Sequence, residues 1–375
     1  MSQFDIDLAA CRGRQKRVLA EMAEKKLDLV VVTVAEHVQW LAGPRYDFKF
    51  APVAALSADG HLTLVAPGRK GKPLDIVAAA DEIVPYEAQW LSTLRNDQRA
   101  AAAAVLLKTL SGKSKPRRVG VEYSSCGPHL SQQFQQMGAE LCDIEPQLYY
   151  FRRRKDADEL ARLKKAIAGT GRMYELARQI VKPGVNELDV FNQLQAVAVR
   201  DYGEMLTGTG NDYACCARGG PPRDRIAQAA ELYVLDLGPA FRGYFADNCR
   251  TISVDGKPTD PQRQAWEQIM KIFPLVERTV KPGKKCHELF DEAAAILKEC
   301  SLGVFDHHLG HGIGLYPHEA PHLNPNWDDV FEEGDVFACE PGLYGPTINA
   351  GIRLENNYRV TATGVELLSD FPLNL

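Results

Sequence analysis

The chain has 375 residues, of which 45% are hydrophobic and 25% charged, and this length and composition favour a folded protein of two domains. Its formal net charge of −5 gives no reason to expect nucleic acid or an anionic membrane as a partner. The nine cysteines are scattered without a CxxC pair, and the first residues contain no apolar signal core. We therefore expect a cytoplasmic protein with free thiols.

The first part of the chain, residues 1–150, predicts a separate α/β domain. Residues 14–27 have the apolar spacing of an amphipathic helix, and residues 27–34 have the continuous apolar run of a buried strand. Further strands are predicted at residues 61–67, 81–86 and 118–124, with a helix over residues 97–110. Strands that alternate with helices favour a largely parallel sheet.

A second domain, residues 155–375, is predicted to begin with a long helix capped by Asp156. It contains an internal repeat, because VKPGVNELDVFN starts at Val181 and VKPGKKCHELFD starts at Val280. We expect each copy to follow one helix and to open another, with Asn186 as the cap in the first copy. Two such halves, related by a pseudo-two-fold axis, would form an α+β domain with a curved antiparallel sheet backed by helices.

Five residues of this second domain are predicted metal ligands: Asp236, Asp247, His311, Glu340 and Glu355. Four converging carboxylates would repel each other, and only cations between them make such a cluster tolerable. A hairpin turn centred on residues 241–242 would place Asp236 opposite Asp247, with roughly 5 Å between their Cβ atoms. Glu340 and Glu355 repeat this arrangement fifteen residues apart.

Opposed carboxylates at this distance suit two divalent ions about 3.5–4 Å apart. One histidine beside four carboxylates indicates Mn²⁺, Co²⁺ or Zn²⁺. Five of the nine histidines lie between His307 and His322. Because imidazole titrates near neutral pH, some of them are expected to bind substrate or to move protons.

The order D-x10-D, HGIG, EPG-x-Y and R-x-E resembles that of the pita-bread (M24-type) metallopeptidases, the group of methionine aminopeptidase, aminopeptidase P and prolidase. This resemblance spans residues 155–370. The first 150 residues resemble the creatinase-type N-terminal domain, with the pattern R…L..M.E..LD..VV followed by WLAG near Trp40. Prolidases and aminopeptidases P carry that domain, which directs the expectation towards hydrolysis of Xaa–Pro bonds.

The resemblance implies that the five ligands hold two divalent ions per subunit, with Mn²⁺ favoured over Co²⁺ or Zn²⁺, and that Asp247 and Glu355 bridge them. The ions would activate a water molecule for attack on the scissile carbonyl, and Glu340 would be the catalytic proton shuttle. His318 would steady the tetrahedral intermediate.

Two further residues receive roles by the same resemblance. His307 is similar to the histidine that lines the proline pocket, so His307 and His318 are expected to act both in catalysis and in substrate binding. Arg353 would anchor the strand of Glu355 or bind a substrate carboxylate.

The chain departs from the resemblance at Gly219. Relatives usually place a substrate-contacting histidine about seventeen residues before the first aspartate, whereas this chain has no histidine between residues 130 and 286. Either the loop has drifted, or substrate binding differs from that of the standard enzyme. Arg218, Arg223 and Arg225 are nearby candidates to bind the carboxylate of a dipeptide.

We therefore expect an Xaa–Pro dipeptidase (prolidase-like) acting on small proline-containing peptides, with aminopeptidase P, which cleaves longer peptides, as the close alternative. Less favoured alternatives are a creatinase-like C–N hydrolase without metals and a non-catalytic pita-bread binding protein. Relatives also suggest a homodimer, in which Trp40 or Trp90 of one subunit is a candidate to reach the partner's site.

Overall fold

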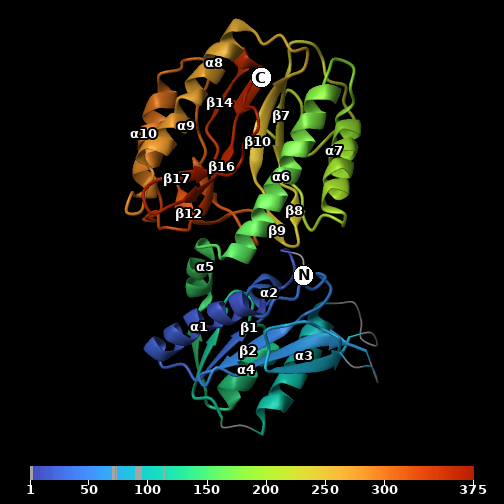
Figure 1. The fold of residues 1–375 in the computed structure, drawn as a ribbon, viewed down its shortest axis with the longest axis vertical. Helices are drawn as coiled ribbons and strands as arrows, with labels where there is room; N and C mark the ends of the chain where they lie inside the picture. Colours follow the sequence, from blue (N-terminus) through green and yellow to red (C-terminus); the bar gives the residue numbers. More distant parts are fainter. Residues whose placement is uncertain (1–2, 70–71, 73, 89–94, 113–114) are drawn as a thin grey trace. The chain divides into compact units, whose positions relative to one another are not determined.

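The computed structural model describes residues 3–69, 72, 74–88, 95–112 and 115–375 (Figure 1). Contacts divide the chain into two compact units, Met1–Phe151 and Arg152–Leu375. Each unit has its own sheet structure and its own buried apolar core.

The N-terminal unit is built on a six-stranded sheet with the order β4-β3-β2-β1-β5-β6. Its strands are β1 (Leu29–Val32), β2 (Val53–Ser57), β3 (Leu62–Gly68), β4 (Glu82–Glu87), β5 (Arg118–Val121) and β6 (Glu140–Asp143). Its helices are α1 (Leu8–Lys25), α2 (Ala35–Ala42), α3 (Arg95–Leu110), α4 (Pro128–Gln136) and α5 (Glu145–Arg153), the last of which crosses into the second unit.

The predicted helices and strands of this unit are confirmed, but the prediction of a largely parallel sheet holds only in part. The pairs β3–β4, β1–β5 and β5–β6 are parallel, whereas β2 runs antiparallel to both β1 and β3. The strand β2 was not predicted from the sequence. The Asp59-Gly60 turn, with Gly60 at φ 91°, joins it to β3 as a hairpin, and strands of a tight hairpin must be antiparallel.

Trp40, a candidate for a shared dimer site, is fully buried in this unit, with its ring 6.5 Å from that of Phe151. It presents no surface to a partner, so that prediction is wrong for Trp40. Trp90 lies outside the described residues.

A buried carboxylate, that of Glu122, ties the end of β5 to the start of α2. Its Oε2 accepts the backbone N–H groups of Thr33 at 2.6 Å and Val34 at 2.9 Å, and its Oε1 lies 2.5 Å from Nδ1 of His37. Burial raises the pKa of Glu122, but the hydrogen bonds from His37 and the backbone outweigh this and hold it below its usual value.

Replacing Glu122 by alanine is expected to lower the free energy of unfolding by about 3–5 kcal/mol, because it leaves buried donors without an acceptor. Urea denaturation followed by circular dichroism measures this loss. Glu140→Ala, which removes an exposed carboxylate from β6, is the control and is expected to stay within about 0.5 kcal/mol of the parent. A loss below about 1 kcal/mol for Glu122→Ala would contradict the structural role assigned to Glu122.

The C-terminal unit combines helices with antiparallel sheets. Its helices are α6 (Ala157–Ile180), α7 (Glu187–Tyr202), α8 (Asp260–Met270), α9 (Ile272–Thr279), α10 (Cys286–Lys298) and the 3₁₀ helix Pro346–Ile348. Its strands are β7 (Leu232–Leu237), β8 (Ala240–Phe241), β9 (Tyr244–Phe245), β10 (Asn248–Ser253), β11 (Gly310–Gly312), β12 (Glu319–Leu323), β13 (Val336–Cys339), β14 (Gly342–Gly345), β15 (Ala350–Arg353), β16 (Asn356–Val360) and β17 (Val365–Leu367).

The strands of this unit form a five-stranded sheet, β12-β11-β13-β16-β17, and three two-stranded pairs, β10–β7, β14–β15 and β8–β9, all antiparallel. In Figure 1 the helices α6 and α7 lie on one side of these strands and α8, α9 and α10 on the other. An α/β unit followed by an α+β unit with antiparallel sheets confirms the predicted fold class.

The internal repeat has the same backbone geometry in both copies. α6 ends before Val181 and α7 begins at Glu187, while α9 ends before Val280 and α10 begins at Cys286. The glycines of the two VKPG segments have φ angles of 97° and 93°. Asp156 and Asn186 are the N-cap residues of α6 and α7, as predicted.

The register predicted for the first carboxylate hairpin is wrong by two residues. Asp236 pairs with Cys249, not with Asp247. The turn is centred on Arg242 and Gly243, with φ angles of 51° and 91°, which is the conformation that hairpins with a two-residue loop prefer. In the second hairpin, β13–β16 and β14–β15 share one register, so Glu340 and Glu355 lie at opposing positions as predicted.

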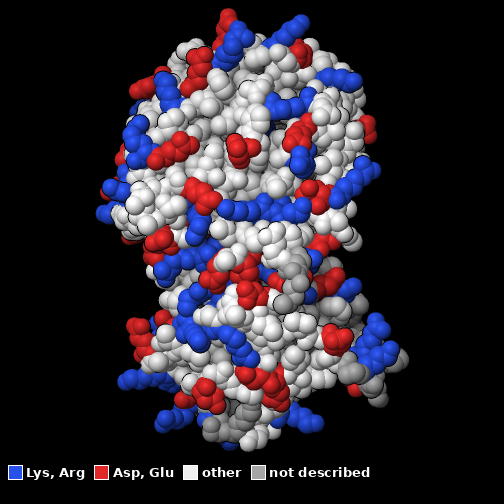
Figure 2. Space-filling model, viewed as in Figure 1, with Lys and Arg blue, Asp and Glu red and all other residues white. Residues whose placement is uncertain are grey.

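Among the helices that the structure describes, none is long and apolar enough to cross a lipid bilayer. Figure 2 shows one face of the molecule, on which lysine and arginine side chains are interspersed with aspartate and glutamate. This face carries no extended basic surface of the kind that binds nucleic acid.

Candidate metal centre

Each of the four carboxylates stands at or next to the end of a strand. Asp236 lies on β7 and Asp247 directly precedes β10, while Glu340 follows β13 and Glu355 precedes β16. The backbone N–H of Glu355 donates to the carbonyl of Cys249 at 2.9 Å, which joins the two hairpins. Strand pairing thus brings residues that are about 100 positions apart in the chain into one place.

The structure brings all five predicted ligands together. Nε2 of His311 lies 3.6 Å from Oδ2 of Asp247 and 3.3 Å from Oε1 of Glu340. Asp247, His311 and Glu355 each offer a ligand atom, and these atoms lie within 4.8 Å of one another. The carboxyl group of Asp236 is close enough to that of Asp247 to raise its pKa.

Burial makes the negative charge of this cluster unfavourable. It raises the pKa of Asp247 and Glu355 well above their usual values, and the neighbouring carboxylates raise both further. Burial also raises the pKa of Asp236, although Arg353 opposes this. Burial acts in the same direction on Glu340, but hydrogen bonds from His308 and His311 hold its pKa well below its usual value.

Unpartnered oxygen atoms indicate what the cluster accepts. Within the described part of the chain, both carboxylate oxygens of Glu355 and Oδ1 of Asp236 are buried and have no hydrogen-bond partner. A buried acceptor without a partner costs about 1–3 kcal/mol, more when it is charged. Several carboxylate oxygens and one imidazole suit a divalent ion such as Mn²⁺, Co²⁺ or Zn²⁺, so the residues present fit a metal centre.

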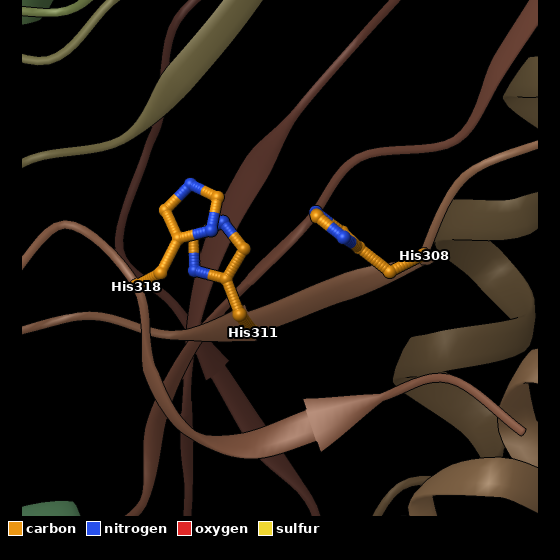
Figure 3. Close-up of side chains that lie close together, drawn as sticks. All are labelled: His308, His311 and His318. Atoms are coloured by element: carbon orange, nitrogen blue, oxygen red, sulfur yellow. The ribbon is translucent and has the colours of Figure 1, made fainter. Parts of the chain in front are cut away.

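Three histidines, His308, His311 and His318, lie close together (Figure 3). The rings of His311 and His318 are stacked with centroids 3.7 Å apart, and Nε2 of His308 lies 2.7 Å from Oε1 of Glu340. Burial and the neighbouring His311 lower the pKa of His318 to about 4, so its imidazole is neutral at pH 7. His308 was not among the predicted site residues, although it stands beside His307 in the histidine cluster.

A second row of side chains connects His307 to Asp236. Nε2 of His307 lies 3.0 Å from the hydroxyl of Tyr344, which accepts a hydrogen bond from Nη1 of Arg353 at 3.2 Å. Nη2 of Arg353 donates to Oδ2 of Asp236 at 2.8 Å. Arg353 therefore contacts the side chain of a predicted ligand directly.

A cavity of about 630 Å³ opens over the centre. His311 and Glu355 do not line its wall. Its wall includes the predicted site residues Asp236, Asp247, His307, His318, Glu340 and Arg353, together with Asp212, Arg218, Gly219 and Tyr344.

Of the three arginines considered for a substrate carboxylate, only Arg218 lines this cavity. Its guanidinium lies 4.1 Å from the centroid of the Tyr344 ring and is paired with Asp306. Arg223 is bonded to Glu187 and Arg225 to Glu231. Because neither Arg223 nor Arg225 lines the cavity, the structure does not support the prediction for these two residues.

The space beside Gly219 is taken by the carboxylate of Asp212. A Cβ atom added at Gly219 would lie 2.7 Å from Cγ of Asp212, closer than any real side chain allows. A side chain at position 219 would therefore require the Asp212 carboxylate to move. No motif pointed to Asp212.

Comparison with known proteins identifies both units. Residues 161–362 match the model of metallopeptidase family M24, and residues 14–153 match that of the creatinase/prolidase N-terminal domain. An uncharacterized peptidase of Staphylococcus epidermidis is 32% identical over 235 residues, which are 61% of this chain and 66% of the relative. A similar peptidase of Staphylococcus aureus is 30% identical over the same length. The match therefore spans just under two thirds of the relatives' own length.

Solved structures share the fold over almost the whole chain. The prolidase from Pyrococcus furiosus has a TM-score of 0.78 at 22% identity, covering 94% of this chain and 99% of the other. An Xaa-Pro dipeptidase from Bacillus anthracis has a TM-score of 0.80 at 23% identity, covering 97% and 99%. An X-Pro aminopeptidase from Thermotoga maritima has a TM-score of 0.79 at 21% identity, covering 96% of this chain and 99% of the other. The chain belongs to metallopeptidase family M24 and carries the creatinase/prolidase N-terminal domain.

Proposed function

We propose that the chain is an Xaa–Pro dipeptidase that works with two divalent ions, Mn²⁺ before Co²⁺ or Zn²⁺, held by Asp236, Asp247, His311, Glu340 and Glu355. The observation that carries this proposal is the cluster of four carboxylates and one imidazole with unpartnered buried oxygens beneath an open cavity. The family resemblance implies that Asp247 and Glu355 would be shared by both ions.

The ions, when bound, would supply an activated water molecule and would polarise the scissile carbonyl. Glu340 is suited to take the proton of that water, because the bonds from His308 and His311 keep its carboxylate ionised. His308 then holds Oε1 of Glu340 in place from 2.7 Å.

Two histidines of the cavity wall are assigned separate roles, one toward the reacting oxygen and one toward the proline of the substrate. His318 is neutral at pH 7 and can donate a hydrogen bond to the oxygen that gains negative charge during the reaction. His307, fixed by the Tyr344 hydroxyl and the carbonyl of His308, forms one side of the proposed proline pocket.

We assign dipeptide specificity to Arg218, which lines the cavity and can form two hydrogen bonds to the terminal carboxylate of an Xaa–Pro dipeptide. One observation favours the alternative, aminopeptidase P. Asp306 already neutralises Arg218, and a longer peptide has no carboxylate at this place to compete with it. The solved structures of similar fold include proteins of both names.

Incubation of the Mn²⁺-loaded protein with Ala-Pro and with Ala-Pro-Ala, followed by product analysis, tests the assignment. Release of alanine from the dipeptide alone supports a dipeptidase, and equal or faster release from the tripeptide moves the assignment to aminopeptidase P. Cleavage of neither by the metal-loaded protein would contradict both. It would turn the search towards C–N hydrolysis of other substrates or towards binding without catalysis.

Location and assembly belong to the same proposal. All nine cysteines are free, which supports a cytoplasmic protein. A homodimer is proposed by similarity, and light scattering of the purified chain at several concentrations checks it.

A further inference from the structure

Asp212 lies directly beside the first metal ligand, although no motif marks it. The two residues form an isolated antiparallel bridge, in which the backbone N–H of Asp236 donates to the carbonyl of Asp212 at 2.9 Å. The side chain of Asp212 lines the cavity. Its position is therefore fixed by the backbone of the metal centre itself.

The two oxygens of the Asp212 carboxylate have different partners. Oδ1 accepts the backbone N–H of Gly220 at 2.6 Å. Oδ2 is paired with Nη2 of Arg353, the same nitrogen that donates to Oδ2 of Asp236 at 2.8 Å. Nη2 thus stands between two carboxylates, only one of which belongs to the predicted ligand set.

Without Asp212, the guanidinium of Arg353 could pair more fully with Asp236 or Glu340. Its Nε has no hydrogen-bond partner and lies 4.0 Å from Oε2 of Glu340, while Oδ1 of Asp236 is also unpartnered. A guanidinium with five donors readily forms two parallel bonds to one carboxylate. If the guanidinium of Arg353 formed two bonds to Asp236 or to Glu340, it would occupy carboxylate oxygens that a cation needs.

We propose that Asp212 is a positioning residue of the metal centre. By holding Nη2 of Arg353, it limits the arginine to one oxygen of Asp236 and leaves Oδ1 of Asp236 available to a divalent ion. This inference rests on the metal centre of the proposed function, and it adds a residue outside the five-ligand set.

The same carboxylate explains the glycine at 219. A Cβ atom at that position would lie 2.7 Å from Cγ and 2.9 Å from Oδ1 of Asp212. Gly219 and Asp212 therefore share one space, so a side chain at 219 displaces Asp212 from Arg353.

The first test measures Mn²⁺ binding by isothermal titration calorimetry on metal-free, full-length protein without any peptide. Asp212→Ala is expected to weaken the binding of at least one ion about 10- to 100-fold, the usual effect of removing a partner of a metal ligand. Asp212→Glu is expected to recover part of this loss because it keeps the charge. Asp306→Ala, which frees the other cavity arginine, is the matched control and is expected to leave Mn²⁺ affinity unchanged within about twofold.

The melting temperature of each variant is measured by circular dichroism, so that a folding defect is recognised and Asp212→Asn can replace the alanine variant. Mn²⁺ affinity equal to that of the parent in a folded Asp212→Ala or Asp212→Asn protein would overturn the inference and leave the proposed peptidase intact. Absence of Mn²⁺, Co²⁺ and Zn²⁺ binding by the parent protein would overturn both.

A double-mutant comparison tests the shared space. Gly219→Ala alone is expected to weaken Mn²⁺ binding because it pushes Asp212 away from Arg353, whereas in the Asp212→Ala background the same change is expected to add no further loss. Equal losses in both backgrounds would show that the two positions act independently and would overturn the shared-space argument.

Discussion

Replacing Glu355 by glutamine is expected to abolish high-affinity metal binding and to lower peptidase activity by more than about 100-fold. Removing a residue that only hydrogen-bonds to a metal ligand already lowers metal affinity about 10- to 100-fold, and removing a proposed ligand shared by both ions is expected to lower it further. Glutamine has nearly the same size and shape as glutamate, so the substitution leaves no cavity in the buried site. Both oxygens of Glu355 are buried and unpartnered, as expected of atoms that would contact a cation.

Metal content after dialysis and activity on Ala-Pro are measured together for this variant. Glu366→Gln, which neutralises a partly exposed glutamate paired with Lys164 and Arg359, is the matched control and is expected to behave as the parent. A Glu355→Gln protein that still bound two ions and cleaved peptide would contradict the assignment of Glu355.

Metal-free protein is expected to lose stability as the pH rises through the neutral range. Folding raises the pKa of Asp247 and Glu355 above their ordinary values of 3.8 and 4.5. A group with a raised pKa contributes its stability below its unfolded value and loses it as the pH rises through the folded value. Glu340 has a lowered pKa and acts in the opposite direction, but its contribution is lost only below pH 4.5. The pKa of His318, lowered from 6.5 to about 4, also adds stability as the pH rises, but only up to about 6.5, so the decline is clearest above that pH.

Melting temperatures across this pH range, with chelator and with Mn²⁺, measure the effect. Bound cations should remove most of the decline, because they compensate the charges that the rising pH creates. Metal-free Glu355→Gln should show a flatter profile than the parent, since one of the titrating groups is gone. A parent protein that becomes more stable with rising pH in chelator would contradict the described electrostatics of the cluster.

The predicted ligands could be found from the sequence because each belongs to a short strand motif marked by glycine or proline. The opposing positions of Glu340 and Glu355 also followed, since one register runs through both halves of their hairpin. The register at Asp236 could not be predicted in this way, because it depends on a turn at Arg242 and Gly243 with two positive φ angles. A shift of one residue in a turn moves every pair along the hairpin.

Other parts of the site lie beyond sequence patterns. Asp212 meets Arg353 across 141 positions of the chain, through a contact that only the folded sheet creates. The partners of Arg223 and Arg225 are likewise set by the folded structure, and neither residue lines the cavity. In the N-terminal unit, the short strand β2 carries no periodic pattern of its own and is defined by its neighbours.

The most direct test of the account is the number of ions that one chain binds. Metal-free protein is dialysed against Mn²⁺, and bound metal is determined by elemental analysis relative to protein concentration. The account predicts two ions per chain, and both should be lost or weakened in Glu355→Gln. One ion or none at saturating Mn²⁺, Co²⁺ and Zn²⁺ would contradict a centre built from these five side chains for two cations.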